Sequence, residues 1–339
     1  MATHDQHVLQ TMARLEAELG GAVGVAARDL DSGRELAHRA DELFPLASVF
    51  KIPLMVDVMR RVDAGGLALD ERVALVERLK SPGGTLIHCH AGLQPTVRDL
   101  LYLMITLSDN TATDMLWRLV GVPSINATMR ALGLETIDCF MPNREYFLIE
   151  TLRNGDWQGL SGPEVVARWR SLDETGRDEA LRRVAELNAA VTGEEFLRRY
   201  TERFGYAEEK DHDDCFVIDQ ALDNQGSPRD IVRLLAMIAE TRCASRASCK
   251  LMIETLTRQE WRNRIPAGLP AGVKVANKTG SVSGTINDAA IVFPPAAAPF
   301  VLVVFCKGLS YRAQDAAEAA IAHIAGSVYH AFTGGRTKS

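Results

Sequence analysis

Ser48 and Lys51 are the first pair of side chains whose types and spacing could carry out acyl-transfer chemistry. Two side chains three residues apart on a helix lie on one face and within reach of each other. A serine at a helix start also lies beside unpaired backbone N–H groups, which favour developing negative charge. A lysine whose pKa is lowered by burial or by its neighbours can deprotonate such a hydroxyl. The pair predicts a serine nucleophile with a lysine base, although Ser48 alone could equally be a helix cap.

A second polar group, Ser108-Asp109-Asn110, falls in a break between two predicted helices. The Ser108 hydroxyl could relay a proton to a leaving nitrogen, and the Asn110 amide could bind a substrate amide or orient Lys51. The alternative is again a cap, because serine and aspartate commonly begin helices.

A third group, Lys278-Thr279-Gly280-Ser281, is expected at the end of a strand. Lysine, threonine and serine side chains there could bind a carboxylate. Gly280 would let a substrate approach the backbone closely, because glycine has no Cβ. The alternative is an ordinary strand end with a turn glycine.

The three groups occur in the order SxxK, SDN and KTG, which is the signature set of serine enzymes that recognise penicillin. The sequence therefore resembles class A β-lactamases and penicillin-binding proteins. Residues 44–51 and 107–112 are similar to the class A segments around the nucleophile and the second serine, and the interval between these serines matches the class A spacing. The similarity covers about residues 8–150 and 225–333.

This resemblance implies a role for each motif residue. Ser48 would be the nucleophile, with Lys51 as the proton acceptor for acylation. Ser108 would pass the proton to the leaving amine, and Lys278 would tune Ser108 electrostatically. The backbone N–H groups of Ser48 and Ser281 would form the oxyanion hole, whose donors are typically worth about 3–4 kcal/mol each. The side chains that would hold the substrate amide and carboxylate are those of Asn110, Thr279 and Ser281.

The sequence departs from the class A pattern where the acyl-enzyme is cleared. That family uses a glutamate in an ExxLN motif, and no such motif occurs after the SDN group here. Glu145 lies within a residue or two of the expected position and is the candidate water-activating base. It could equally be a helix-start glutamate or the partner of Arg144. If it is not the base, hydrolysis of a β-lactam should stall at the acyl-enzyme.

The order of predicted elements indicates how the motifs are positioned. Helical spacing of apolar residues alternates with strand-like segments so that strands fall near both chain ends and helices fill the middle. This predicts an α/β (α+β), β-lactamase-like fold: an antiparallel sheet built from both chain ends and flanked by helices, plus an all-helical lobe. The helices are expected at 8–19, 50–62, 97–106, 112–120, 231–239, 250–256 and 313–332, and the strands at 23–30, 35–40, 273–278, 288–293 and 300–307.

We expect one domain over residues 1–339. Its α/β lobe would consist of residues 1–50 and 260–335, and its helical lobe of residues 51–259. Within the helical lobe, about residues 155–223 are rich in Glu, Arg and Asp and contain amphipathic stretches. We interpret this segment as an extra charged helical insertion.

Composition excludes several classes of partner. The formal charge is −6 with no long basic run, so no nucleic-acid partner is expected. The longest charge-free run, residues 289–306, is interrupted by prolines and reads as two strands, so no membrane partner is expected either. The N-terminus has no basic segment followed by an apolar one, which predicts a cytoplasmic protein whose six scattered cysteines are reduced.

No metal and no other cofactor are expected. His88 and His90 alternate as on a strand, but no third ligand follows at a recognisable spacing. Residues 211–215 read as a solvated acidic loop. No phosphate-binding glycine loop or dinucleotide fingerprint is present.

These observations predict a serine hydrolase that forms an acyl-enzyme through Ser48 and hydrolyses a cyclic or linear amide, in the manner of a β-lactamase. The substrate would be a small amide, lactam or ester that carries a carboxylate. One alternative is a cytosolic amidase, esterase or transacylase for another acyl compound; another is a sensor that traps penicillin covalently without turnover. The oligomeric state is left open.

Overall fold

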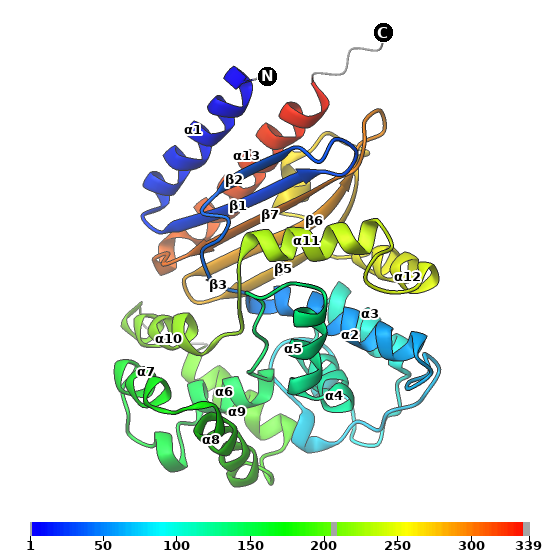
Figure 1. Ribbon diagram of the computed structural model, residues 1–339. Helices are drawn as coiled ribbons and strands as arrows, with labels where there is room; N and C mark the ends of the chain where they lie inside the picture. Colours follow the sequence, from blue (N-terminus) through cyan, green and yellow to red (C-terminus); the bar gives the residue numbers. More distant parts are fainter. Residues whose placement is uncertain (1, 205–208, 335–339) are drawn as a thin grey trace.

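A five-stranded antiparallel sheet forms the upper part of the molecule in Figure 1. The computed structural model describes residues 2–204 and 209–334. The strand order is β2-β1-β7-β6-β5, so strands from the two ends of the chain share one layer. This confirms the predicted fold class. The strands are β1 (Ala22–Asp29), β2 (Glu35–His38), β5 (Lys274–Val282), β6 (Thr285–Phe293) and β7 (Phe300–Lys307).

The charge-free run near the C-terminus forms most of β6 and β7, two of the three inner strands of this sheet. β6 pairs with β7 in a register that sets Ala290 opposite Leu302, and the prolines fall in the connection between them. Nearly every residue of both strands is buried, because helices or the other lobe cover each face. A strand covered on both faces reads as a continuous apolar run. No helix in the described part of the chain is long and apolar enough to span a membrane.

Helices cover both faces of the sheet. α1 (Ala2–Leu19) and α13 (Gln314–Thr333) pack on one face (Figure 1), where Met12, Ile321 and Val328 belong to the apolar core between helix and strand. α11 (Pro228–Ala239) packs on the other face and lies between the sheet and the helical lobe. This second core is continuous with the core of the helical lobe.

The helical lobe lies below the sheet and carries two of the three motifs. Its longer helices are α2 (Lys51–Asp63), α3 (Val97–Thr106), α4 (Asn110–Val120), α5 (Val122–Ala131), α6 (Asn143–Thr151) and α12 (Arg246–Leu256). Short 3₁₀ turns join or precede other elements at η1 (Ala47–Phe50), η2 (Glu77–Leu79), η3 (Leu86–His88), η5 (Ile265–Gly268) and η6 (Tyr311–Ala313). A reciprocal capping box between Thr96 and Asp99 starts α3, so this helix begins where its sequence predicts.

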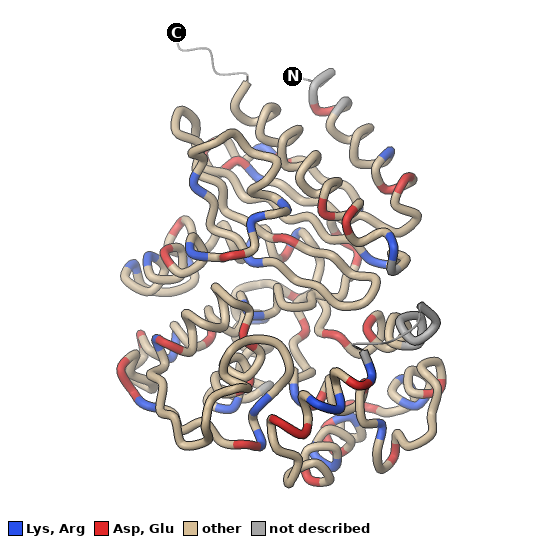
Figure 2. The backbone as a smooth tube through the Cα atoms, turned by 180° about the vertical axis from the view of Figure 1, so that it is seen from behind, with Lys and Arg blue, Asp and Glu red and all other residues tan. Residues whose placement is uncertain are grey.

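The charged middle of the chain folds as a helical bundle with its own apolar core. It comprises η4 (Gly155–Trp157), α7 (Gly162–Ser171), α8 (Glu174–Leu187), α9 (Gly193–Phe204) and α10 (Glu209–Leu222). Trp157, Trp169 and Phe196 are buried in its core. Acidic and basic residues alternate along its chain (Figure 2), and many of them form ion pairs along α8 and α9.

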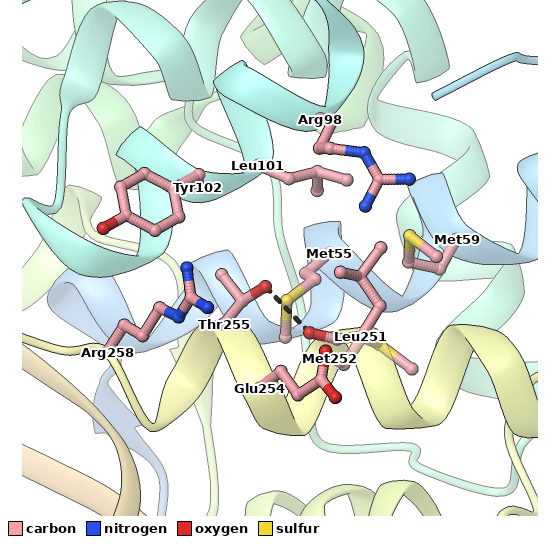
Figure 3. Close-up of a pocket in the computed structure, with 10 residues that line it drawn as sticks. All are labelled: Met55, Met59, Arg98, Leu101, Tyr102, Leu251, Met252, Glu254, Thr255 and Arg258. Atoms are coloured by element: carbon pink, nitrogen blue, oxygen red, sulfur yellow. Dashed lines mark hydrogen bonds between the residues drawn. The ribbon is translucent and has the colours of Figure 1, made fainter. Parts of the chain in front are cut away.

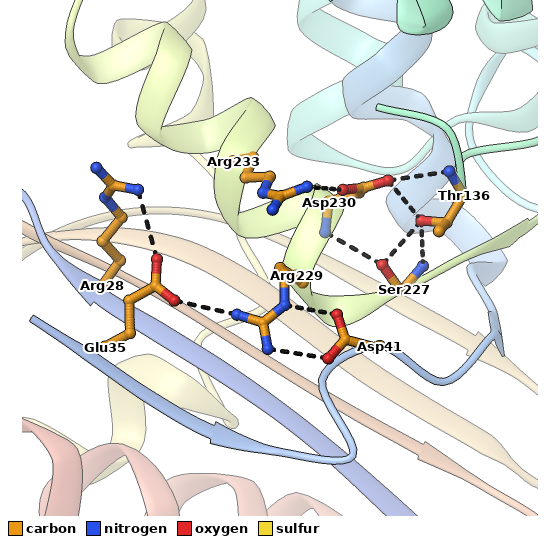
Figure 4. Close-up of polar contacts among 8 residues, drawn as sticks. All are labelled: Arg28, Glu35, Asp41, Thr136, Ser227, Arg229, Asp230 and Arg233. Atoms are coloured by element: carbon orange, nitrogen blue, oxygen red, sulfur yellow. Dashed lines mark hydrogen bonds and ion pairs between the residues drawn. The ribbon is translucent and has the colours of Figure 1, made fainter. Parts of the chain in front are cut away.

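A polar network fixes the start of α11 against both lobes (Figure 4). Arg229 binds Asp41 at 2.6 Å and Glu35 at 3.0 Å on the sheet side. On the other side, the Asp230 carboxylate accepts hydrogen bonds from the Thr136 backbone N–H and hydroxyl, at 2.9 and 2.7 Å. This helix start therefore ties the sheet to the connection that follows α5.

Several local predictions were wrong. The KTGS group does lie at the end of a strand, but that strand, β5, continues past the predicted end at 278 to Val282, because the pairing with β6 extends to Thr285. His88 ends a 3₁₀ turn and is not on a strand. Residues 211–215 belong to helix α10 and not to a loop. The sequence reading also missed α5 and a two-residue ladder between β3 (Phe44–Pro45) and β4 (Gln225–Gly226).

Candidate active site

Ser48 and Lys51 lie where the 3₁₀ turn η1 passes into α2. The Lys51 side chain is fully buried, and its Nζ lies 3.1 Å from the Ser48 Oγ. The same Nζ lies 3.0 Å from the Ser108 Oγ and donates hydrogen bonds to the Ser108 carbonyl at 2.7 Å and to Asn110 Oδ1 at 2.6 Å. One amine therefore connects two of the three sequence motifs.

The SDN group forms the turn between α3 and α4. Ser108 has a positive φ of 58°, which turns the chain sharply enough to place its hydroxyl beside Lys51. Asp109 is fully buried and caps α4, and its carboxylate also accepts the backbone N–H groups of Thr85 and Leu86 at 2.6 and 2.8 Å. The aspartate of the motif is thus a structural anchor that holds the neighbouring loop against Ser108 and Asn110.

The KTG group approaches from the opposite lobe on strand β5. The Lys278 Nζ donates to the Ser108 Oγ at 3.0 Å and to the Thr279 carbonyl at 2.8 Å. Thr279 is 6% exposed, whereas Ser281 is exposed at the mouth of the site. A Cβ on Gly280 would lie 3.0 Å from the Ser48 backbone nitrogen and 2.7 Å from the Leu46 carbonyl, so the strand can pass this close only with glycine here.

Burial changes the proton affinity of both lysines. It lowers the pKa of the Lys51 ammonium to about 7, although the negative charges of Asp109, Asp114 and Asp223 act to raise that pKa. Burial, followed by the positive charge of Lys51, lowers the pKa of Lys278 well below its ordinary value. An amine with a pKa near neutrality can accept a proton, whereas an ordinary surface lysine cannot.

Arg264, which the sequence reading missed, supports the substrate-facing end of β5. Its guanidinium donates to the Ser281 hydroxyl at 2.6 Å and to the carbonyls of Gly280 and Asn287 at 2.9 and 2.7 Å. Glu318 on α13 holds the other side of the guanidinium at 3.0 Å. No motif marks this arginine, because its partners on β5, β6 and α13 are distant from it in the sequence and are brought near it only by the fold.

A second wall faces Ser48 across a pocket of about 50 Å³. Its polar members are Asn143 and Tyr146 from α6 and Asp223 and Asn224 from the segment after α10. Asp223 is 6% exposed, and its Oδ2 accepts the Ala47 backbone N–H at 2.5 Å. Ala47 itself has a positive φ of 44°. The segment after α10 therefore contacts the residue directly before Ser48.

Glu145 lies in the first turn of α6 but is not among the residues that line this pocket. Burial raises the pKa of its carboxyl group, and burial, followed by the charge of Glu145, raises the pKa of Asp114 to about 8. Asp114 accepts the backbone N–H groups of Asn143 and Arg144 at 2.9 and 2.8 Å and so fixes the start of α6. A deacylating role for Glu145 stays a prediction.

A larger pocket lies away from the motifs (Figure 3). It has a volume of about 190 Å³ and is bounded by α2, α3 and α12. Methionine and leucine side chains form most of its wall, with Arg98, Tyr102 and Arg258 also around it. None of the residues in the SxxK, SDN and KTG groups lines it, so the chemistry belongs to the smaller pocket beside Ser48.

Comparison with known proteins finds similarity to β-lactamases in both sequence and structure. The sequence model of a family described as "Beta-lactamase enzyme family" matches residues 8–156 and 184–332. A β-lactamase of Streptomyces albus G is 31% identical over 301 residues, which are 86% of this chain and 74% of that protein. Beta-lactamase L2 of Stenotrophomonas maltophilia is 38% identical over 122 residues, 36% of this chain and 40% of that protein. The structure of a β-lactamase from Sphaerobacter thermophilus DSM 20745 matches with a TM-score of 0.69 at 28% identity and covers 98% of both chains.

Proposed function

Because the chain belongs to the beta-lactamase enzyme family of serine hydrolases that act on amide bonds, we propose that it opens a β-lactam ring or a related carboxylate-bearing amide through an acyl-enzyme on Ser48. The observation that carries this proposal is the position of Lys51, whose amine lies 3.1 Å from one serine hydroxyl and 3.0 Å from the other.

Acylation would begin with proton transfer from the Ser48 hydroxyl to the neutral amine of Lys51. The pKa of about 7 supports this step, because a substantial fraction of the amine is unprotonated at neutral pH. The Ser48 oxygen would attack the carbonyl carbon of the substrate amide. The Ser108 hydroxyl lies between Lys51 and Lys278, and it would carry the proton to the leaving nitrogen as the C–N bond breaks.

The negative charge that develops on the carbonyl oxygen needs fixed donors. The backbone N–H groups of Ser48 and Ser281 would supply them, and the close approach of Gly280 to the Ser48 nitrogen supports this pairing. The exposed hydroxyl of Ser281 and the guanidinium of Arg264, which donates to that hydroxyl, would bind the substrate carboxylate.

Mixing the purified protein with nitrocefin tests the proposal when ring opening and intact mass are followed together. We expect ring opening to continue over many turnovers while a transient adduct is present at one per chain. A chromogenic linear ester serves as the comparison substrate. Hydrolysis of the ester alone, with no reaction with nitrocefin, would favour an esterase or amidase instead. A permanent nitrocefin adduct without turnover would favour a covalent receptor.

A further inference from the structure

The pocket beside Ser48 has the size of a water site. Its volume of about 50 Å³ exceeds the roughly 10–15 Å³ that one water needs but leaves little room for the body of a substrate. It is bounded by Ser48 on one side and by Asn143, Asp223 and Asn224 on the other. Asn110 and Ser281 also line the pocket, whereas Ser108 and Lys278 do not. Among the described residues, the carboxylate that lines this pocket is that of Asp223.

Three contacts fix Asp223 at this place. The β3–β4 ladder pairs Pro45 with Gln225, two residues beyond Asp223. The Leu46 backbone N–H donates to the Asn224 carbonyl at 2.7 Å, and the Ala47 N–H donates to Asp223 Oδ2 at 2.5 Å. The carboxyl group is therefore held against the turn that carries the nucleophile, although 176 positions separate Ala47 from Asp223 in the sequence.

The Asp223 carboxylate has lone pairs left for a water. Its Oδ2 accepts the Ala47 N–H, and its Oδ1 accepts the Asn224 N–H at 2.8 Å. A carboxylate offers about four acceptor positions, so each oxygen can accept one more hydrogen bond.

We propose that Asp223, and not Glu145, is the base that activates water for deacylation. This inference rests on the proposed acyl-enzyme at Ser48. The Asp223 carboxylate takes a proton from water while the water oxygen bonds to the acyl carbonyl carbon. The tetrahedral intermediate then collapses, the bond from that carbon to the Ser48 Oγ breaks, and the proton returns from Asp223 to Oγ. The product is the free acid of the substrate, and Asp223 is an anion again.

The electrostatic surroundings give this step a pH dependence. Burial and the charge of Asp219 raise the pKa of Asp223 to about 8, while the two backbone N–H groups and Lys51 act in the opposite direction. Burial raises the pKa values of nearby Cys139 and Tyr146 well above their ordinary values, and the charge of Asp223 raises them further. Both side chains therefore stay neutral. A base acts only when ionised, so deacylation should accelerate as pH rises through about 8.

The test compares three carboxyl-to-amide variants by burst and steady-state kinetics with nitrocefin and by intact mass. Asp223→Asn keeps an acceptor for the Ala47 N–H, so it should acylate within about threefold of the parent. Its deacylation should slow by roughly 10²–10⁴-fold, the usual contribution of general-base catalysis, and adduct should accumulate. Asp138→Asn is the matched control, because this side chain bonds Asn126 and does not line the pocket. The third variant is Glu145→Gln.

The outcomes separate the inference from the proposed function. If the parent forms no adduct at Ser48, the proposed function itself fails. If the parent turns over and Asp223→Asn deacylates equally fast, or if adduct accumulates in Glu145→Gln instead, the assignment of Asp223 is overturned. The pH dependence of deacylation in the parent decides the matter should Asp223→Asn not fold. A tenfold loss per pH unit below about 8 supports Asp223, and a rate independent of pH contradicts it.

Discussion

Ser48 lies between two walls that the chain builds in different ways. The wall with Lys51, Ser108 and Lys278 comes from three short motifs, and its amines and hydroxyls contact one another at 3.0–3.1 Å. The facing wall with Asn143 and Asp223 comes from the start of α6 and the segment after α10, where none of the three motifs occurs. In the proposed mechanism, the first wall would supply the groups for acylation, and the second would supply the carboxylate for hydrolysis of the acyl-enzyme. The two half-reactions can therefore be altered separately.

Removal of the amine tests the first wall with the largest expected effect. Lys51→Ala should slow acylation by nitrocefin about 10²–10⁴-fold, because the Ser48 hydroxyl loses its proton acceptor. Stopped-flow absorbance under single-turnover conditions measures this rate. Lys250→Ala on the exposed face of α12 is the control and should match the parent. Equal acylation rates for Lys51→Ala and the parent would mean that another base acts.

A substitution that disturbs the close approach of β5 to Ser48 should have the next largest effect on the acylation rate. Gly280→Ala should lower the acylation rate about 10²-fold, because its Cβ would lie 3.0 Å from the Ser48 nitrogen and displace the nucleophile. Gly66→Ala, whose Cβ would meet a backbone oxygen at an ordinary 3.6 Å, should have little effect. The same single-turnover measurement applies, and an unchanged rate in Gly280→Ala would remove the proposed oxyanion pair.

The acylation rate should also depend on pH. Burial lowers the pKa of Lys51 to about 7, and only its neutral form accepts a proton. Acylation should therefore fall about tenfold per pH unit as pH drops below 7 and level off above it. A profile of single-turnover rates from pH 5 to 9 measures this. A rate that rises as pH falls would contradict a neutral lysine base.

Replacing Arg144, which binds the charged helical bundle, should have the smallest effect on acylation but a clear effect on the free energy of unfolding. Arg144 is buried and donates to the carbonyls of Lys80, Asn188 and Val191, which join the helical lobe to the insertion. Arg144→Met should lower the free energy of unfolding by about 2–4 kcal/mol, because these carbonyls lose their donor. Urea unfolding measures the change. Exposed Arg170→Met is the control, and equal stability of the two variants would show that Arg144 does not anchor the insertion.

The difference between the walls also explains what the sequence could predict. Ser48 and Lys51 are three positions apart, and Ser108 and Lys278 belong to recognisable groups, so local pattern indicated the acylation side. Strands β6 and β7 were predictable because most of their residues form one charge-free, largely apolar run. The contact of Asp223 with Ala47 was missed because it depends on a two-residue ladder between segments that are far apart in the sequence. Glu145 was proposed from position along the chain alone, which does not say which way a side chain faces.

The central claim is that Ser48 carries the acyl group. Rapid quenching of the nitrocefin reaction, followed by intact-mass and peptide-mapping mass spectrometry, tests it most directly. We predict one adduct per chain on the peptide that contains Ser48, and none in Ser48→Ala, while a Ser171→Ala control on the insertion labels like the parent. An adduct that maps to Ser108, or undiminished labelling and turnover in Ser48→Ala, would contradict the account.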